Sequence, residues 1–324
     1  MKLESSLDLL HLFGKLNTKR LDKVGYDTVR FWKENTGAKK VPVLLKNVQE
    51  HKSQHGFPYI TGSLDNLYIS TRNNKVTVNG SLCKYFHSNN VVKLSRDDTK
   101  NAIEKLQDEL QFLFQDSNVS RIDVGCCIEL DGHVKEYLGL LDHFPRFQRL
   151  VQPSSVYFKN GQKQICFYDK IAEMRSSGSL KIFPTLAGRN ILRVEDRYMR
   201  RVTNQFKRAI TAKDLYDQNF YDRINMELKK NVIKIHKIKT VKPMKESMTS
   251  KDYEDFLVAS YIAEHGEEKV LRMIDNNRDN FSNARALQRI RDKVKNSKLL
   301  IQDNRLVTEL ESKIIKSDLN PVLI

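Results

Sequence analysis

The sequence lacks any long apolar run. No stretch approaches the ~18–20 consecutive apolar residues that a membrane-spanning helix needs. The first residues also lack the pattern of a secretory signal, because Glu4, Asp8 and His11 interrupt the leucines there and no cleavage pattern follows. We therefore expect a protein of the cytoplasm that has no membrane partner.

Sulfur and imidazole ligand motifs are missing as well. The four cysteines form no C-x-x-C pair or other zinc spacing, and in a cytosolic chain they are expected to be reduced and buried: Cys83, Cys126, Cys127 and Cys166. The eight histidines are scattered, with no His-hydrophobe-His motif. The sequence therefore offers no zinc-type ligand set, and any metal ligands must be chiefly carboxylates.

Acidic charge is in deficit, since 56 Lys and Arg outnumber 40 Asp and Glu and leave a net charge of +16. Such a field favours a polyanionic partner, and nucleic acid leads because no basic amphipathic helix with a clean apolar face opens or closes the chain. The stretch 229–245 holds seven lysines and no acidic residue. It is either a solvated linker or a strip that contacts the phosphate backbone, and composition leaves both readings open.

Apolar patterns divide the 324 residues into a strand-rich part and a helical part. Residues 6–13 could be a first strand. Further strands are indicated at 57–80, 119–130, 154–168 and 189–199, with hairpin turns at Asn73-Asn74 and Asn160-Gly161. A helix over 96–115 is indicated by the stripe Ile103, Leu106, Leu110 and Leu113.

The last third favours helices, over 212–228 and 253–310, with no proline between Pro243 and Pro321. We predict an α+β fold whose mainly antiparallel central sheet has about five strands covered by helices. The expected division is a strand-rich domain at 1–205 and a helical C-terminal region at 206–324 that contains the lysine stretch.

Two predicted strands carry ionised side chains on one face. Residues alternate sides along a strand, so Arg121 and Asp123 share one side. By the same rule Arg193, Glu195 and Arg197 share one side of the later strand. Carboxylates with arginines suit a divalent cation beside a phosphate. Ion pairs across a solvent-facing sheet surface are the alternative interpretation.

The segment Phe167-Tyr168-Asp169-Lys170-Ile171-Ala172-Glu173 ends the strongest hairpin. A tyrosine hydroxyl can attack a phosphodiester, keep the 5′-phosphate as phosphotyrosine and release a 3′-hydroxyl. Lys170 shares the face of Tyr168 if the strand continues, and Glu173 follows once the chain turns into a helix. Tyr168 is one of 12 tyrosines, so taken alone it is better explained as a core aromatic than as a nucleophile.

Four short motifs, in this order along the chain, together indicate a known family. They are G-S-L-C-K-Y-F-H-S-N-N at 80–90, R-I-D at 121–123, F-Y-D-K-I-A-E at 167–173 and L-R-V-E-D-R at 192–197. Over about residues 5–200 the chain thereby resembles the gene II/X family of phage and plasmid replication proteins, the filamentous-phage origin-nicking initiators. Ser88 stands where that family often has glycine.

The resemblance implies a rolling-circle initiator with a tyrosine-endonuclease-like fold, and it implies roles for particular residues. The implied catalytic residues are Tyr168, Lys170 and Glu173. The implied ligands of Mg²⁺ or Mn²⁺ are Asp123 and Glu195. The residues expected to contact DNA are Lys84, Asn90, Arg121, Arg193 and Arg197, with Ser81 part of the same upstream motif as Lys84 and Asn90.

The function so implied is nicking and rejoining of one strand at an origin, in the host cytoplasm if a phage encodes the chain. Its partners would be single-stranded origin DNA and the host helicase and polymerase. Two alternatives stay open. One is a relaxase or transposase of a mobile element with the same tyrosine chemistry, and the other is a catalytically silent DNA-binding regulator of the same fold.

Overall fold

The computed structural model describes residues 24–34, 41–91, 93–242, 246–302 and 304–317. Its fold is α+β, with a large antiparallel sheet and a helical C-terminal region, as predicted. The predicted strand at 6–13 lies outside these residues. Within the described residues, no helix is both long enough and apolar enough to cross a membrane.

The central sheet has ten strands in the order β2-β3-β4-β5-β1-β6-β11-β10-β9-β8, and every neighbouring pair is antiparallel. The strands are β1 (Gly25–Glu34), β2 (Lys46–Lys52), β3 (Pro58–Leu64), β4 (Leu67–Arg72), β5 (Lys75–Ser81), β6 (Asn118–Glu129), β8 (Gln148–Gln152), β9 (Ser155–Lys159), β10 (Lys163–Asp169) and β11 (Ile191–Tyr198). The predicted number of about five strands was wrong. Edge strand β2 is almost wholly exposed, so it carries no apolar alternation to reveal it.

Both predicted hairpin turns are confirmed. Asn73 adopts a left-handed φ of 53° between β4 and β5, a conformation that asparagine tolerates well. Between β9 and β10, the Asn160 side chain accepts hydrogen bonds from the backbone amides of Gln162 and Lys163, at 2.9 and 2.8 Å. These turns fix the register of the strands that carry the polar motifs.

One face of the sheet is apolar and packs on helices. Ile122, Val124, Phe167 and Val194 join a core with α3 (Arg96–Leu110), α4 (Val134–Leu140) and α7 (Gln218–Lys234). The predicted helix over 96–115 ends early, because Gln111 turns left-handed with φ 55° and leaves Leu113 66% exposed.

The opposite face is covered only in part. Helix α5 (Lys170–Ser176) and the short turns η3 (Ser179–Ile182) and η4 (Pro184–Leu186) pack over one end of it. Their apolar side chains form a small cluster with Cys127 and Ile191 from the sheet. The remaining short elements of the sheet region are η2 (Val41–Leu44), α2 (Leu82–His87), α6 (Val202–Phe206) and η5 (Ala212–Tyr216). All four cysteines are buried, as predicted, and none of them forms a disulfide bond.

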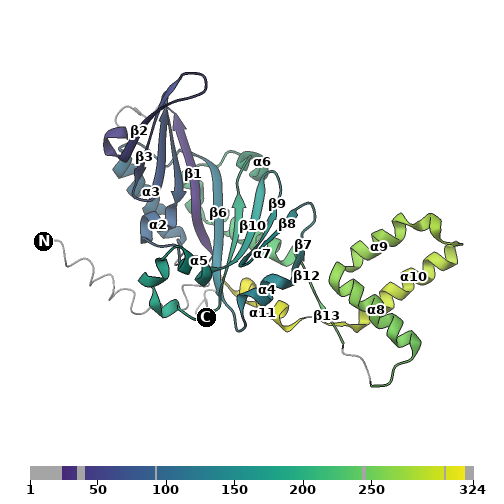
Figure 1. Cartoon of the computed structure of the whole chain (residues 1–324). Coiled ribbons are helices and arrows are strands. Elements are labelled where there is room, and N and C mark those ends of the chain that lie inside the picture. Colours follow the sequence, from purple (N-terminus) through teal and green to yellow (C-terminus); the bar gives the residue numbers. More distant parts are fainter. Residues whose placement is uncertain (1–23, 35–40, 92, 243–245, 303, 318–324) are drawn as a thin grey trace.

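Beyond α7 the chain leaves the sheet and later returns to it. Helices α8 (Ser250–His265), α9 (Glu267–Asn276) and α10 (Ala284–Ser297) form their own apolar cluster and stand apart from the sheet in Figure 1. The short 3-10 helix η6 (Arg278–Asn280) joins α9 to α10, and η7 (Lys298–Leu300) follows α10. Helix α11 (Arg305–Lys316) then packs Leu310 and Ile314 into the sheet's core. The expected domain boundary at 205/206 stays a prediction.

Two short strands lie within the lysine stretch, and each pairs with a strand elsewhere in the chain. Strand β12 (His236–Lys237) pairs with β7 (Leu141–His143), and β13 (Thr240–Val241) pairs with β14 (Ile301–Gln302). Lys237 is buried and its ammonium contacts Glu311 at 2.8 Å. Lys230, Lys234 and Lys242 are exposed. The stretch is therefore partly ordered structure, and only some of its lysines are accessible to DNA.

Candidate active site

Strand register gathers the polar motifs on the partly covered face. Arg197 on β11 pairs with Asp123 on β6, and Arg193 pairs with Tyr168 on β10. Glu195, between the two arginines, lies opposite Gly125. The alternation predicted for β6 and β11 places their polar side chains on one face and their apolar side chains in the core.

Tyr168 and Glu195 are in direct contact. The tyrosine hydroxyl donates a hydrogen bond of 2.9 Å to Oε1 of Glu195. Arg193 Nε donates to the same oxygen at 2.8 Å, and Arg197 Nε donates to Oε2 at 2.8 Å. The Glu195 carboxylate is thus fixed from both sides and aimed at the phenol.

The pKa values of Tyr168 and Glu195 are shifted in opposite directions. Burial, followed by the charge of Glu195, raises the pKa of Tyr168 well above its ordinary value. Burial would also raise the pKa of Glu195, but Arg193 and then Arg197 outweigh it and hold that pKa below its ordinary range. At rest the proton therefore stays on Tyr168, and Glu195 is an ionised acceptor.

Arg193 is the fully buried centre of the site. Besides Glu195, its guanidinium contacts Asp27 on β1 and donates to the backbone oxygen of Asn90 at 2.9 Å. Lys93 lies 3.6 Å from the same Asp27 carboxylate. Burial would raise the pKa of Asp27, yet the Arg193 charge and a hydrogen bond from Ser81 lower it. Arg193 was predicted to contact DNA, and that role stays a prediction, while its burial favours positioning Glu195.

Sequence reasoning missed Asp27. A signal was present, because this acid interrupts the β-forming run that became β1, and a lone acid inside such a strand is seldom buried without a cationic partner. The run was not recognised as a strand, so its acid was not considered. Asp27 supplies the carboxylate that balances Arg193.

Asp123 forms a second ion-paired group. Arg121 donates to both of its oxygens, at 2.9 and 2.6 Å, and Arg197 Nε lies 3.9 Å away. Burial nevertheless raises the pKa of Asp123 to about 6, because Arg121 offsets only part of the desolvation. The side chains of Arg121 and Arg197 are 22% and 24% exposed, so they form the solvent-facing rim of the site.

Lys170 lies at the start of a helix and not on a continuation of the strand that carries Tyr168. Strand β10 ends at Asp169, whose side chain caps α5 by accepting from the amide of Ala172. Lys170 is therefore the first residue of a helix and is buried. Its ammonium contacts Glu173 at 2.6 Å and Asn90 Oδ1 at 3.0 Å.

The upstream motif splits between the site and the surface. Asn90 accepts hydrogen bonds from both Lys170 and Arg193, so it joins the two halves of the site. Ser81 donates to Asp27 and also caps α2. Lys84 is exposed on α2. Ser88, where glycine is frequent in the resembling family, adopts a left-handed φ of 60° at the end of α2.

Gly125 makes room for the acceptor carboxylate. A Cβ at this position would lie 2.4 Å from the Val194 carbonyl oxygen and 2.9 Å from Cγ of Glu195. Any larger residue would therefore push β11 away from β6 or displace Glu195. The absent side chain lets Glu195 lie close over β6, within reach of Tyr168.

Tyr198, another tyrosine of β11, lies on the opposite face. Its strand partner is Ile122 of the apolar core, its ring packs 5.0 Å from that of Phe206, and it is only 4% exposed. Its neighbour Asp196 is buried on that side with Lys163 at 2.8 Å. The polar face and Tyr198 are thus separated by the sheet.

Asp123 and Glu195 offer hard oxygen donors on adjacent strands and on one face, which suits Mg²⁺ or Mn²⁺. Guanidinium groups hold both carboxylates, however. The ligand assignment stays a prediction.

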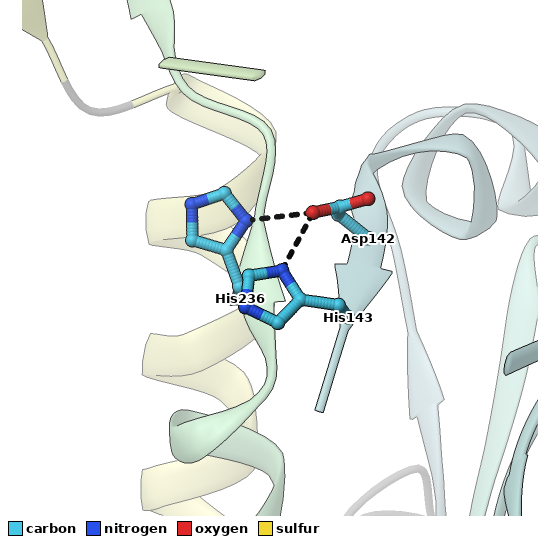
Figure 2. Close-up of side chains that lie close together, drawn as sticks. All are labelled: Asp142, His143 and His236. Atoms are coloured by element: carbon cyan, nitrogen blue, oxygen red, sulfur yellow. Dashed lines mark hydrogen bonds and ion pairs between the residues drawn. The ribbon is translucent and has the colours of Figure 1, made fainter. Parts of the chain in front are cut away.

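Among the described residues, one group of acidic and histidine side chains is spaced to hold a metal ion: Asp142, His143 and His236 (Figure 2). Sequence reasoning missed it, because 93 positions separate the two histidines and no short motif contains both. The group lies on β7 and β12, outside the ten-stranded sheet.

A known protein family matches the part of the chain that builds the polar face. The family model describes the N-terminal part of the gene II replication-associated protein and matches residues 26–231, which include every residue of the polar face. No curated protein matches the chain.

Proposed function

The chain belongs to the gene II family of phage replication initiators, and from this premise we propose that it nicks one strand of origin DNA through Tyr168. The hydroxyl oxygen would attack the scissile phosphorus and form a Tyr168–phosphate bond as the bond to the 3′-oxygen breaks. The 5′ side stays covalently attached, and the 3′-oxygen leaves, takes a proton from solvent and becomes the primer end. Attack by that 3′-hydroxyl on the phosphotyrosine reverses the step and rejoins the strand.

The observation that carries this proposal is the contact between Tyr168 and Glu195. A nucleophile must lose its proton as it attacks, and an ionised carboxylate 2.9 Å away is placed to accept it. Since the pKa of Tyr168 is raised and that of Glu195 is lowered, full transfer before attack is unfavourable. The proton would therefore move to Glu195 as the new bond forms.

The positive groups have distinct proposed roles. Arg193 and Lys170 are buried, so they would hold Glu195 and Asn90 in place. Arg121 and Arg197 lie at the rim and can exchange a carboxylate for a DNA phosphate, for which guanidinium groups have matching geometry. Mg²⁺ or Mn²⁺, held by Asp123 and Glu195, would polarise the phosphate and favour the phenolate.

Labelled single-stranded origin DNA provides the test. With Mg²⁺ or Mn²⁺ present, the wild-type protein should form a covalent adduct that survives denaturing electrophoresis, and Tyr168→Phe should form none. Tyr157→Phe is the matched control, because Tyr157 pairs with Cys166 on the adjacent strand and faces the same side. Its adduct should equal that of the wild type.

Two outcomes would change the proposal. An adduct formed by Tyr168→Phe would place the nucleophile elsewhere, and the same assay on Tyr198→Phe would then identify or exclude the tyrosine on the apolar face. Absence of any adduct from the wild type, with origin DNA still bound, would make the protein a silent DNA-binding relative.

A further inference from the structure

A second group of metal-type ligands lies where the chain crosses from the sheet to the C-terminal helices. Asp142 and His143 come from β7, and His236 comes from the paired strand β12 (Figure 2). Both imidazoles direct Nδ1 at the same carboxylate oxygen, Oδ2 of Asp142, at 2.7 Å from His143 and 3.2 Å from His236. The two rings stack with centroids 4.8 Å apart.

The spacing of these atoms is close to that of a metal-bound set. Ligands at about 2.0–2.1 Å from a tetrahedral ion lie roughly 3.3 Å from one another. The two nitrogen-to-oxygen distances are near this value, and all three ligand atoms lie within 4.8 Å of one another. Side-chain rotations alone would therefore bring the three groups onto one ion.

The backbone of Gly266 lies beside the two rings. A Cβ added to Gly266, the residue between α8 and α9, would lie 3.2 Å from Nε2 of His236 and 3.7 Å from Cε1 of His143. Gly266 has φ +82°, a conformation that residues with a side chain disfavour. Because it has no side chain, only its backbone borders the two imidazole rings. The imidazoles are thus seated between the sheet region and the C-terminal helices.

Space remains for a further ligand. A cavity of about 700 Å³ adjoins the group and is lined by both histidines, Glu268 and Glu311. The three side chains are partly exposed, so an ion has a route in from solvent. One coordination position would face this cavity and take water.

We infer that Asp142, His143 and His236 form a binding site for one divalent transition-metal ion of the zinc type. Two imidazole nitrogens and one carboxylate oxygen suit Zn²⁺ or Co²⁺ better than Mg²⁺, which prefers oxygen ligands only. The ion would fasten β12 to β7, beside the hydrogen bonds from the Ile238 amide to Leu140 and from the Lys239 amide to Ala263. The site uses β7 and β12, whereas Tyr168 lies on β10 of the ten-stranded sheet, so the two can be tested separately.

Metal uptake by the full chain is the direct test. Protein freed of metal with a chelator is titrated with ZnCl₂ in a calorimeter, and CoCl₂ is added to a second sample. We expect about one Zn²⁺ per chain and visible Co²⁺ bands of a nitrogen–oxygen site, both lost in His143→Gln and in His236→Gln. His55→Gln, an exposed histidine in the β2–β3 turn, should keep both.

Amide hydrogen exchange tests the fastening role. Zn²⁺ should slow exchange at Ile238 and Lys239 in the wild type and in His55→Gln, but not in His236→Gln, while the Val194 amide in the central sheet stays unchanged in all three. Asp142→Asn provides a milder variant if His236→Gln unfolds. Absence of uptake by the wild type, or uptake by both histidine variants equal to that of the wild type, would overturn the site. Stoichiometric uptake without the change at Ile238 and Lys239 would overturn the fastening.

Discussion

The two faces of the central sheet are built from alternate residues of the same strands, yet different forces hold them. On the apolar face, Phe167 and Val194 are buried against helices and need only shape and volume. On the polar face, Tyr168, Arg193 and Glu195 are held by hydrogen bonds and ion pairs whose geometry matters atom by atom. A one-residue step along β10, from Phe167 to Tyr168, thus passes from a core position to the position of the proposed nucleophile.

The largest effect should come from removing charge on the polar face. Glu195→Gln removes the proposed proton acceptor, and we expect the nicking rate to fall roughly 10²–10⁴-fold, with origin binding in a gel-shift assay largely kept. Asp123→Asn should abolish the response to Mg²⁺ or Mn²⁺, and excess EDTA should stop the wild type. The control is Asn190→Asp, just before β11. Full nicking in EDTA would show that the carboxylates act without an ion.

The next largest effect should be a difference in unfolding free energy between substitutions on the two faces. Phe167→Ala leaves a cavity in the core, and we expect a loss of about 3–5 kcal/mol of unfolding free energy in urea titrations. Tyr168→Phe removes one hydrogen bond to a charged acceptor, worth about 1.5–3 kcal/mol at most. If both variants lost the same stability, the polar face would be structural in the same degree as the core.

Arg193→Met tests a polar-face residue that we expect to contribute both to folding stability and to nicking. It leaves Asp27 and Glu195 buried without their main cation, which should cost about 3–5 kcal/mol in the same urea titration and also stop nicking. Arg121→Met, at the exposed rim, is the matched control and should lose far less stability. Equal losses would mean that Lys93 and Arg197 already balance the two carboxylates.

Lys170→Ala should slow single-turnover nicking more than it weakens DNA binding, because the ammonium holds Asn90 and is too deeply buried to meet DNA. Lys181→Ala, an exposed lysine in η3, should change neither. A loss of affinity as large as the loss of rate would instead make Lys170 a DNA contact.

The smallest effect should come from the lysine stretch. Neutralising exposed Lys230, Lys234 and Lys242 together should weaken binding to all sequences alike, and it should flatten the salt dependence by about 0.7 per lost phosphate contact on single strands. A control triple of exposed lysines outside the stretch, Lys46, Lys52 and Lys100, should leave the slope unchanged. An unaltered slope in the first triple would make the stretch a solvated linker.

Local pattern was sufficient for much of this fold. The turn at Asn160-Gly161 and the alternation along β6 and β11 depend on neighbouring residues, so the sequence alone placed Tyr168, Asp123 and Glu195 on strands. Two kinds of feature could not be found that way. Asp27 reaches Arg193 only because β6 pairs with both β1 and β11, and His143 meets His236 only when β12 pairs with β7. Contacts of long sequence separation are set by the packing of the whole chain.

The pairing of β13 with β14 has a consequence for how this architecture can vary. Thr240 faces Gln302 and Val241 faces Ile301, so the chain leaves and re-enters the body of the protein at one point. The excursion between them contributes nothing to the sheet's apolar core among the described residues. We therefore expect that the length of this segment can change without loss of the sheet's apolar core, provided that β13, β14 and the returning α11 are kept.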